Sequence, residues 1–226
     1  MKYENVAKGH FISRPNRFIA SIDINGIRHT VHVKNTGRCR ELLIPGAKVL
    51  LEKSSNKNRK TEYDLIAVYK NDILVNMDSQ APNKAVGEWL QKGKLIQEPV
   101  LIKPEMVYGK SRLDFYVEGK NEKAYIEVKG VTLEKDKTAV FPDAPTQRGA
   151  KHLEELIKAK QKGFRAIAVF VIQMKGCRYF EPNYQTDPEF ASQLKKAKDN
   201  GVEILALDCI VTENSITIDK ELEVKL

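Results

Sequence analysis

The chain has 226 residues, with 38 Lys and Arg against 30 Asp and Glu, which gives a formal net charge of +8. Apolar residues make up 42% of the composition, which is enough to form a buried core, so a disordered or collagen-like chain is excluded. The excess charge is uneven, because residues 1–82 carry a net +6 and residues 83–226 a net +2. Such an excess is typical of proteins that bind polyanions; a basic surface that only aids solubility is the alternative.

The sequence shows no targeting or membrane-spanning segment. No apolar stretch follows the first residues, so no secretory signal is expected. The longest apolar run, residues 166–172, is much shorter than the roughly 20 residues that span a bilayer. The three cysteines (Cys39, Cys177 and Cys209) are far apart and form no CxxC pair, so neither a disulfide framework nor a zinc site is expected. We therefore expect a cytoplasmic protein with no membrane partner.

The first third of the chain has the pattern of short strands separated by turns. Residues 17–24 and 27–34 alternate in polarity on either side of Asn25-Gly26, the strongest short-range signal for a hairpin. Further strands are expected at 47–52, 62–69 and 73–77. About five strands without a helix predict a small β-barrel of the oligonucleotide-binding (OB) type, which we assign to residues 1–82.

The pattern changes near residue 83, where turn-forming residues cluster. From there, helices are expected at 84–95, 147–162 and 188–200, and strands at 100–103, 111–117, 124–133, 165–173 and 202–211. This alternation predicts an α/β domain over residues 83–226, with a mixed sheet and helices on its faces. The whole chain is thus predicted to have two domains, a β-barrel followed by an α/β domain.

Two neighbouring strands of the second domain carry an acidic pair and a lysine. If residues 111–117 and 124–133 form a hairpin, Asp114 lies opposite Glu127, and Lys129 lies two residues further on the same face as Glu127. Opposed residues have Cβ atoms about 4.5–5.5 Å apart, so two carboxylates there repel unless a cation lies between them. Mg²⁺ suits such a pair, since it prefers one or two carboxylates together with waters and phosphate oxygens.

These residues predict a metal centre with Asp114 and Glu127 as ligands, Mg²⁺ as the cofactor and Mn²⁺ as the alternative. The backbone carbonyl of Val128 is a candidate further ligand, and Glu88 and Glu105 are both candidates for a third carboxylate. Lys129 is a candidate catalytic residue that orients a water or stabilises charge on a phosphate. The alternative is that the Glu-Val-Lys triplet is surface charge, and a one-residue change of register would remove the site.

Two further segments offer contacts to phosphates. The predicted helix at 147–162 begins near Arg148, Lys151 and His152, and free backbone N–H groups at a helix N-terminus attract anions. In the barrel, Asn35, Thr36, Gly37 and Arg38 follow a strand whose outer face is expected to carry Arg28, His32 and Lys34. Arg17 is placed nearest Lys34 across the hairpin, which predicts a basic strip. A tight turn with a structural Asn is the alternative for the segment from Asn35 to Arg38.

The chain resembles the sugar fermentation stimulation protein A (SfsA) family. The resemblance rests on blocks that run in order from residue 14 to residue 207. They are Arg17-Phe18, Asn35-Thr36-Gly37-Arg38, Pro45-Gly46-Ala47, Ser111-Arg112-Leu113-Asp114-Phe115, Glu127-Val128-Lys129, Phe141-Pro142-Asp143-Ala144, Arg148-Gly149, His152-Leu153 and residues 201–206. The family usually has an acidic residue where Gln147 stands and often has Val where Pro145 stands.

The resemblance implies an OB-like domain joined to a domain similar to PD-(D/E)XK nucleases, with Asp114, Glu127 and Lys129 at the nuclease motif. It also implies DNA binding and a regulatory link to maltose and related sugar metabolism. Our first hypothesis is a DNA-binding protein with a metal-dependent phosphodiesterase centre. The second is a non-enzymatic DNA-binding regulator that retains a nuclease fold. A third, an enzyme that binds a nucleotide or small anion at the helix beginning after Thr146, lacks a Gly-rich phosphate loop.

Overall fold

The computed structural model of the protein describes residues 1–35, 37–56, 58–109 and 111–226. The first sheet is built from β1 (Val6–Ser13), β2 (Ile19–Ile24), β3 (Ile27–Val33), β4 (Lys48–Lys53), β5 (Tyr63–Lys70) and β6 (Ile73–Asn76). The strand order is β3-β2-β1-β4-β5-β6, and β3 also pairs with β5. Strands β1 to β5 therefore close into a five-stranded barrel, as predicted, and β6 extends the sheet beside β5.

The hairpin between β2 and β3 follows the register that the sequence predicts. Asn25 and Gly26 both have positive φ, 54° and 81°, as a two-residue hairpin turn requires. Pairing runs from Ile24 opposite Ile27 to Ile19 opposite His32. Inward side chains such as Val31 are fully buried, so the alternating pattern correctly predicts which residues of this hairpin face the barrel interior.

Within the described residues, the second sheet has nine strands in the order β10-β11-β13-β15-β14-β12-β9-β8-β7. These are β7 (Leu101–Tyr108), β8 (Ser111–Glu118), β9 (Lys123–Val131), β10 (Leu133–Lys135), β11 (Thr138–Phe141), β12 (Arg165–Ile172), β13 (Tyr179–Pro182), β14 (Glu203–Thr212) and β15 (Ser215–Val224). At its centre, β12 pairs in parallel with both β9 and β14, whereas β7, β8 and β9 form an antiparallel meander. The sheet is thus mixed, as expected.

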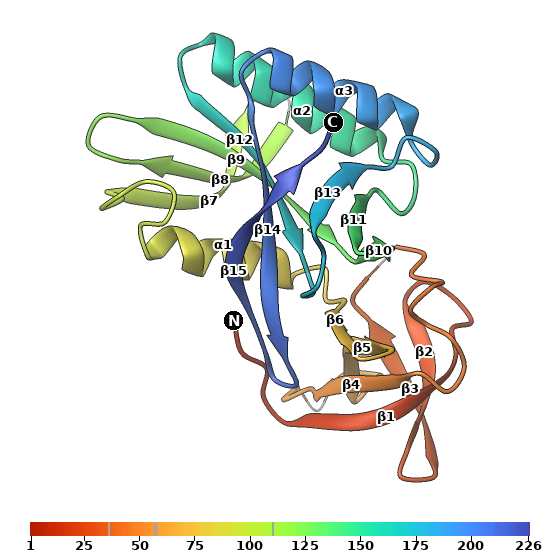
Figure 1. The fold of residues 1–226 in the computed structure, drawn as a ribbon. Coiled ribbons are helices and arrows are strands. Elements are labelled where there is room, and N and C mark those ends of the chain that lie inside the picture. Colours follow the sequence, from red (N-terminus) through yellow and green to blue (C-terminus); the bar gives the residue numbers. More distant parts are fainter. Residues whose placement is uncertain (36, 57, 110) are drawn as a thin grey trace.

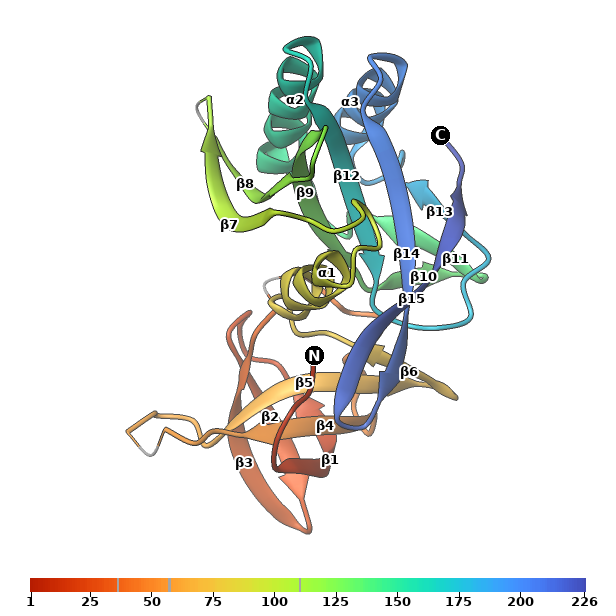
Figure 2. The same cartoon turned by 90° about the vertical axis from the view of Figure 1, so that its left-hand side faces the viewer.

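The sheet is covered by the helices α1 (Ala81–Gln91), α2 (Gln147–Gln161) and α3 (Pro188–Asp199). Alternate residues of β12 face opposite sides: Phe170 packs in the core that contains Leu153 of α2, and Val169 in the core that contains Val86 of α1. Two views at right angles show α2 and α3 on one face of the sheet and α1 on the other, between the sheet and the barrel (Figures 1 and 2). The core around α1 also contains Leu50 and Ile66 of the barrel, so α1 joins the two sheets.

Several element bounds differ from the sequence-based expectation. Helix α1 begins at Ala81 rather than residue 84, because Pro82 occupies the first turn, where a missing N–H costs nothing. Strand β7 continues to Tyr108, and β1, β10, β11, β13 and β15 were not expected. The division into domains after residue 82 stays a prediction. In the part of the chain that the structure describes, no helix is long and apolar enough to cross a membrane.

Candidate functional site

Asp114 and Glu127 lie on adjacent strands, where the predicted hairpin register is confirmed. Strands β8 and β9 pair from Glu118 opposite Lys123 to Phe115 opposite Ile126. Asp114 and Glu127 lie one step beyond the last paired residues of these two strands. The position of the short connection was therefore sufficient to align the two strands as far as Phe115 and Ile126.

The alternation within β8 is broken at Asp114, which the sequence pattern did not reveal. Pairing between β7 and β8 skips the step at Asp114, where its counterpart Glu105 has a φ of 53°. Leu113 consequently packs in the core beside α2, whereas Phe115 packs in the core beside α1. Strict alternation along β8 would place Leu113 and Phe115 on the same face of the sheet. The irregularity at Asp114 instead places them on opposite faces, because it changes the side on which the next residue lies.

Both carboxylate oxygens of Asp114 accept hydrogen bonds from residues of other elements. The side-chain amide of Asn83, on α1, donates to Oδ1 at 2.8 Å, and the backbone N–H of Val128 donates to Oδ2 at 2.7 Å. Burial and the nearby charge of Glu127 together raise the pKa of Asp114, in spite of these two donors. The ionised form of Asp114 is therefore disfavoured in this environment, and a cation close to the carboxylate would stabilise it.

Glu127 is only 2% exposed, and its two oxygens have different surroundings. The Lys129 ammonium and Nδ1 of His152 both donate to Oε1. Burial opposes ionisation of Glu127, but the hydrogen bond from His152 and the charge of Lys129 outweigh it, so the pKa of Glu127 is lowered. The other oxygen, Oε2, is buried, and none of the residues that the structure describes donates a hydrogen bond to it. An ionised carboxylate with one unpartnered buried oxygen is incomplete without a further ligand.

The donor set around this pair suits a hard divalent cation that keeps several waters. Two carboxylates with a free oxygen match the preference of Mg²⁺ for few protein ligands. Among the residues that the structure describes, no group of three or more His, Cys, Asp or Glu side chains is arranged to hold a metal. Both candidate third carboxylates have other partners: Glu88 binds the N-terminal amine at 2.6 Å, and the exposed Glu105 lies 3.5 Å from Arg112. A part for either of them in the site stays a prediction.

The start of α2 contributes to this site differently from the prediction. Thr146 caps the helix, as expected, with its hydroxyl accepting from the backbone N–H of Gly149 at 3.1 Å. Arg148 and Lys151 are exposed, but His152 is only 5% exposed and contacts Glu127. Because the ionised Glu127 can only accept, Nδ1 of His152 carries a hydrogen, and Nε2 can then accept from Arg148 Nε at 3.4 Å. The His152 side chain therefore lies against Glu127 rather than on the surface with Arg148 and Lys151, and a direct contact between His152 and nucleic acid stays a prediction.

The barrel segment that begins at Asn35 is held by internal contacts. Asn35 accepts from the backbone N–H of Gly37 at 2.8 Å and donates to the carbonyl of Met77 at 3.0 Å, so the structural alternative holds for its side chain. The guanidinium of Arg14, a residue that sequence reasoning missed, donates to four backbone carbonyls, those of Asn35, Gly37, Arg38 and Arg17. The Arg38 side chain is exposed. Thr36 lies outside the described residues.

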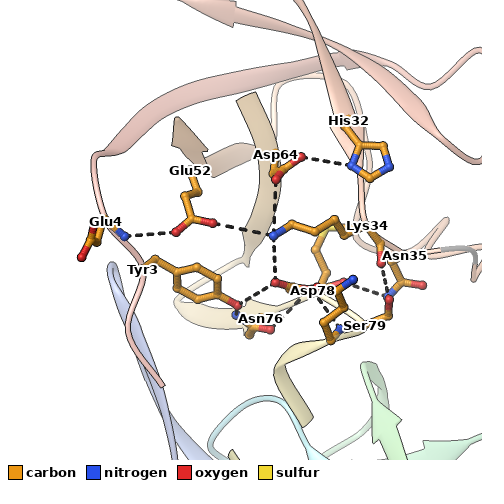
Figure 3. Close-up of polar contacts among 12 residues, drawn as sticks. Tyr3, Glu4, His32, Lys34, Asn35, Glu52, Asp64, Asn76, Asp78 and Ser79 are labelled. Carbon is orange, nitrogen blue, oxygen red and sulfur yellow. Dashed lines mark hydrogen bonds and ion pairs between the residues drawn. The ribbon is translucent and has the colours of Figure 1, made fainter. Parts of the chain in front are cut away.

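The predicted basic strip on β2 and β3 is wrong in part. Figure 3 shows the Lys34 ammonium among three carboxylates, at 3.2 Å from Asp78, 3.4 Å from Asp64 and 3.7 Å from Glu52, and His32 also contacts Asp64. These acids neutralise the part of the strip nearest the second domain.

Arg17 and Arg28 are both exposed but lie at opposite ends of the hairpin. The guanidinium of Arg17 lies over the ring of Phe18, at 5.3 Å from its centroid. Arg28 pairs across the strands with Asp23, and its Nε donates to Ser21 at 2.7 Å. The exposed arginines of the barrel are therefore not one continuous strip.

Comparison with known proteins places this arrangement in a family. Two family models match: "SfsA N-terminal OB domain" over residues 12–77 and "Sugar fermentation stimulation protein RE domain" over residues 80–215. The chain belongs to the sugar fermentation stimulation protein family. Family members with the name "Sugar fermentation stimulation protein homolog" include that of Clostridium beijerinckii, 56% identical, and that of Ruminiclostridium cellulolyticum, 55% identical, each over 100% of both chains.

A solved structure of the family has the same fold. It is Pyrococcus furiosus SfsA in complex with Ca²⁺, which is 30% identical and superposes with a TM-score of 0.92 over 100% of this chain and 98% of that one. The barrel and the mixed α/β sheet are therefore the fold of this family, as the sequence resemblance implied.

Proposed function

We propose that the protein binds DNA and hydrolyses phosphodiester bonds with a divalent cation held by Asp114 and Glu127. Mg²⁺ is the proposed cofactor and Mn²⁺ the alternative. The observation that carries the proposal is the buried Oε2 atom of Glu127, which has no hydrogen-bond partner among the described residues and belongs to a carboxylate beside Asp114 and the Lys129 ammonium. Pyrococcus furiosus SfsA was solved in complex with Ca²⁺, which supports a divalent cation in this family. The assignment of the second domain to the PD-(D/E)XK nuclease class is part of the same proposal.

The residues around the pair have separate tasks in this proposal. Asp114 and Glu127 hold the cation, which when bound supplies Lewis-acid stabilisation of a phosphate and a more acidic water. Lys129 is close enough to Glu127 to share its oxygen, so its ammonium is placed to stabilise negative charge that develops on the phosphate. His152 keeps Glu127 ionised and oriented by its hydrogen bond to Oε1.

DNA reaches this centre, in our proposal, across the junction between the barrel and α2. Arg38 on the barrel and Arg148 and Lys151 on α2 are exposed. The backbone N–H of Arg38 donates to Asp143 at 2.8 Å, and Asp143 lies in the segment that leads into α2. Exposed guanidinium groups grip phosphates with paired donors and gain affinity by releasing counterions.

The test is cleavage of supercoiled, linear and single-stranded DNA by purified protein with Mg²⁺ or Mn²⁺. We expect metal-dependent cleavage that is lost in Asp114→Ala and Glu127→Gln. The matched control is Asp72→Ala, which removes an exposed carboxylate in the turn after β5 and should keep wild-type activity. Wild-type cleavage no greater than that of Asp114→Ala on every DNA form would contradict the enzymatic proposal.

A second candidate function is DNA binding without cleavage. The exposed arginines at the barrel–α2 junction favour it, because they serve binding whether or not a cation is held. In that case DNA affinity depends on salt and survives Glu127→Gln but weakens in Arg38→Ala. Gel shifts in rising salt, run beside the cleavage assay, separate the two candidates.

A further inference from the structure

The segment that connects β6 to α1 is hydrogen-bonded to the residues that follow β3 in the barrel. Asn35 donates to the carbonyl of Met77 at 3.0 Å, and the backbone N–H of Ser79 donates to the carbonyl of Lys34 at 3.3 Å. Between these two contacts, the Lys34 ammonium reaches the carboxylate of Asp78 at 3.2 Å (Figure 3). Barrel residues therefore hold the three residues that lead into α1.

Asp78 in turn holds the start of α1. Its side chain is fully buried, and Oδ1 accepts from the backbone N–H of Gln80 at 2.9 Å, while its carbonyl accepts from the N–H of Ala81 at 3.1 Å. A negative charge is favoured at a helix N-terminus, but a buried carboxylate needs a cation as well. Lys34 supplies it: burial lowers the pKa of this lysine, yet Asp78 and Asp64 outweigh burial and raise it, so the ammonium stays charged.

The first turn of α1 touches both strands of the candidate metal centre. Asn83 donates to Asp114 at 2.8 Å on β8. On β9, Gly130 directly follows Lys129, and a Cβ there would lie 2.8 Å from Pro82 Cγ and 2.5 Å from Gln173 Oε1. Gln173 donates to Asn76 at 2.9 Å and to the carbonyl of Asp78 at 3.1 Å. A chain of contacts therefore runs from Lys34 through Asp78 and the first turn of α1 to Asp114 on β8 and to Gly130, next to Lys129, on β9.

We propose that Lys34 of the barrel is a positioning residue: through Asp78 it fixes the first turn of α1, and so holds Asn83 against Asp114. The role of Asp114 as a metal ligand rests on the proposed function, but the held orientation of Asp114 does not. If Lys34 had a purely structural role, its replacement would change only the stability of the protein. A positioning residue also changes the mobility of Asp114 in the folded protein, because Asn83 and Val128 both donate hydrogen bonds to the Asp114 carboxylate.

The test compares Lys34→Met with Lys34→Arg, which keeps the charge, and with Lys53→Met. Lys53 is the matched control, since it is an exposed lysine paired with exposed Glu62 at 2.9 Å in the same barrel. Two readouts are taken on folded protein well below its melting temperature. One is the hydrogen-exchange rate of the Val128 amide, which donates to Asp114, and the other is the affinity for Mn²⁺ measured by calorimetry.

In Lys34→Met we expect faster exchange at Val128 and Mn²⁺ affinity that is weaker by about 10-fold or more, as for loss of residues that orient metal ligands. Lys34→Arg should have a Val128 exchange rate and a Mn²⁺ affinity close to those of wild type, and Lys53→Met should match wild type in both. Wild-type exchange and affinity in Lys34→Met would overturn the proposal, even if the melting temperature falls.

Two further outcomes keep this proposal separate from the proposed function. If wild-type protein binds no Mn²⁺, the metal centre is rejected, and exchange at Val128 alone decides whether Lys34 positions Asp114. If Lys34→Met does not fold, Asp78→Asn takes its place, because it weakens the attraction to Lys34 while keeping a side-chain oxygen for the N–H of Gln80. Unchanged Val128 exchange in that variant would likewise overturn the proposal.

Discussion

The carboxylate of Asp143 accepts a hydrogen bond from the backbone N–H of Arg38 at 2.8 Å. Arg38 belongs to the barrel, and Asp143 to the segment between β11 and α2, so this bond crosses from one sheet to the other. Gly37 lies so close that a Cβ on it would be 2.6 Å from Asp143 Oδ2 and 2.9 Å from Asn35 Oδ1. The exposed arginine of the barrel is thereby held at a fixed place relative to the start of α2.

This close contact predicts that Gly37→Ala destabilises the protein. The added methyl group must displace Asp143 or Asn35, and both carry hydrogen bonds, so we expect a loss of about 1–3 kcal/mol in the free energy of unfolding. Urea unfolding measures it. Gly87→Ala is the matched control: its Cβ would lie 3.6 Å from Phe115, and an alanine inside α1 should add roughly 0.5–1 kcal/mol. Equal stability of Gly37→Ala and wild type would contradict the tight contact.

Arg38 should contribute to DNA affinity more than Arg28 does. Arg38 is exposed beside the Asp143 contact, whereas Arg28 lies across from Asp23 at the far end of the hairpin. Removing one side chain that binds a phosphate reduces the slope of log affinity against log salt by about 0.9. We expect that reduction for Arg38→Ala and a smaller one for Arg28→Ala, measured by gel shift or fluorescence anisotropy from 50 to 200 mM salt. A larger change for Arg28→Ala would place the DNA elsewhere on the barrel.

The strand pairings that sequence predicted correctly depend on contacts that are close in the chain. Strands β8 and β9, which carry Asp114 and Glu127, are joined by a short connection, so the position of the turn was sufficient to fix the register of the strands as far as Phe115 and Ile126. The same is true of the Asn25-Gly26 hairpin, where both turn residues have positive φ.

The parts that sequence missed depend on long-range closure. Lys34 and His32 read as solvent-facing cations, but the parallel pairing of β3 with β5 brings Asp64 opposite His32. That pairing forms only when the barrel closes, and no local sequence pattern indicates it. His152 and Asn83 face the acidic pair for a similar reason, since the two helices that carry them pack on opposite faces of one sheet.

Lys129→Met should separate metal binding from cleavage. Lys129 shares Oε1 of Glu127 with His152, so removing its ammonium leaves both carboxylates and removes a competing cation. We expect Mn²⁺ to bind at least as tightly as to wild type by calorimetry, while cleavage falls by about 10²–10³-fold, typical for loss of one transition-state stabiliser. Lys123→Met, an exposed change on the same strand, serves as the control and should leave both unchanged. Weaker metal binding in Lys129→Met would show that the lysine organises Glu127 instead.

Asp64 should make the stability of the barrel depend on pH at the acid end. Burial would raise its pKa, but the hydrogen bond from Arg59 and the charge of Lys34 outweigh it and lower the pKa from 3.8 to about 2. Because the folded pKa is the lower one, the ionised form stabilises the fold above pH 4, and this contribution is lost as the pH falls towards 2. At 1.36 kcal/mol per pKa unit it amounts to about 2 kcal/mol.

Asp64→Asn tests this contribution directly. At pH 7 we expect the free energy of unfolding of the variant to be about 2 kcal/mol lower than that of wild type. This difference should shrink steadily between pH 4 and pH 2. Urea unfolding at pH 7, 5, 4, 3 and 2 gives the comparison, with Asp72→Asn as the control because Asp72 is exposed in the turn after β5. A difference between Asp64→Asn and wild type that stays constant over this range would mean that Asp64 acts through packing rather than through its charge.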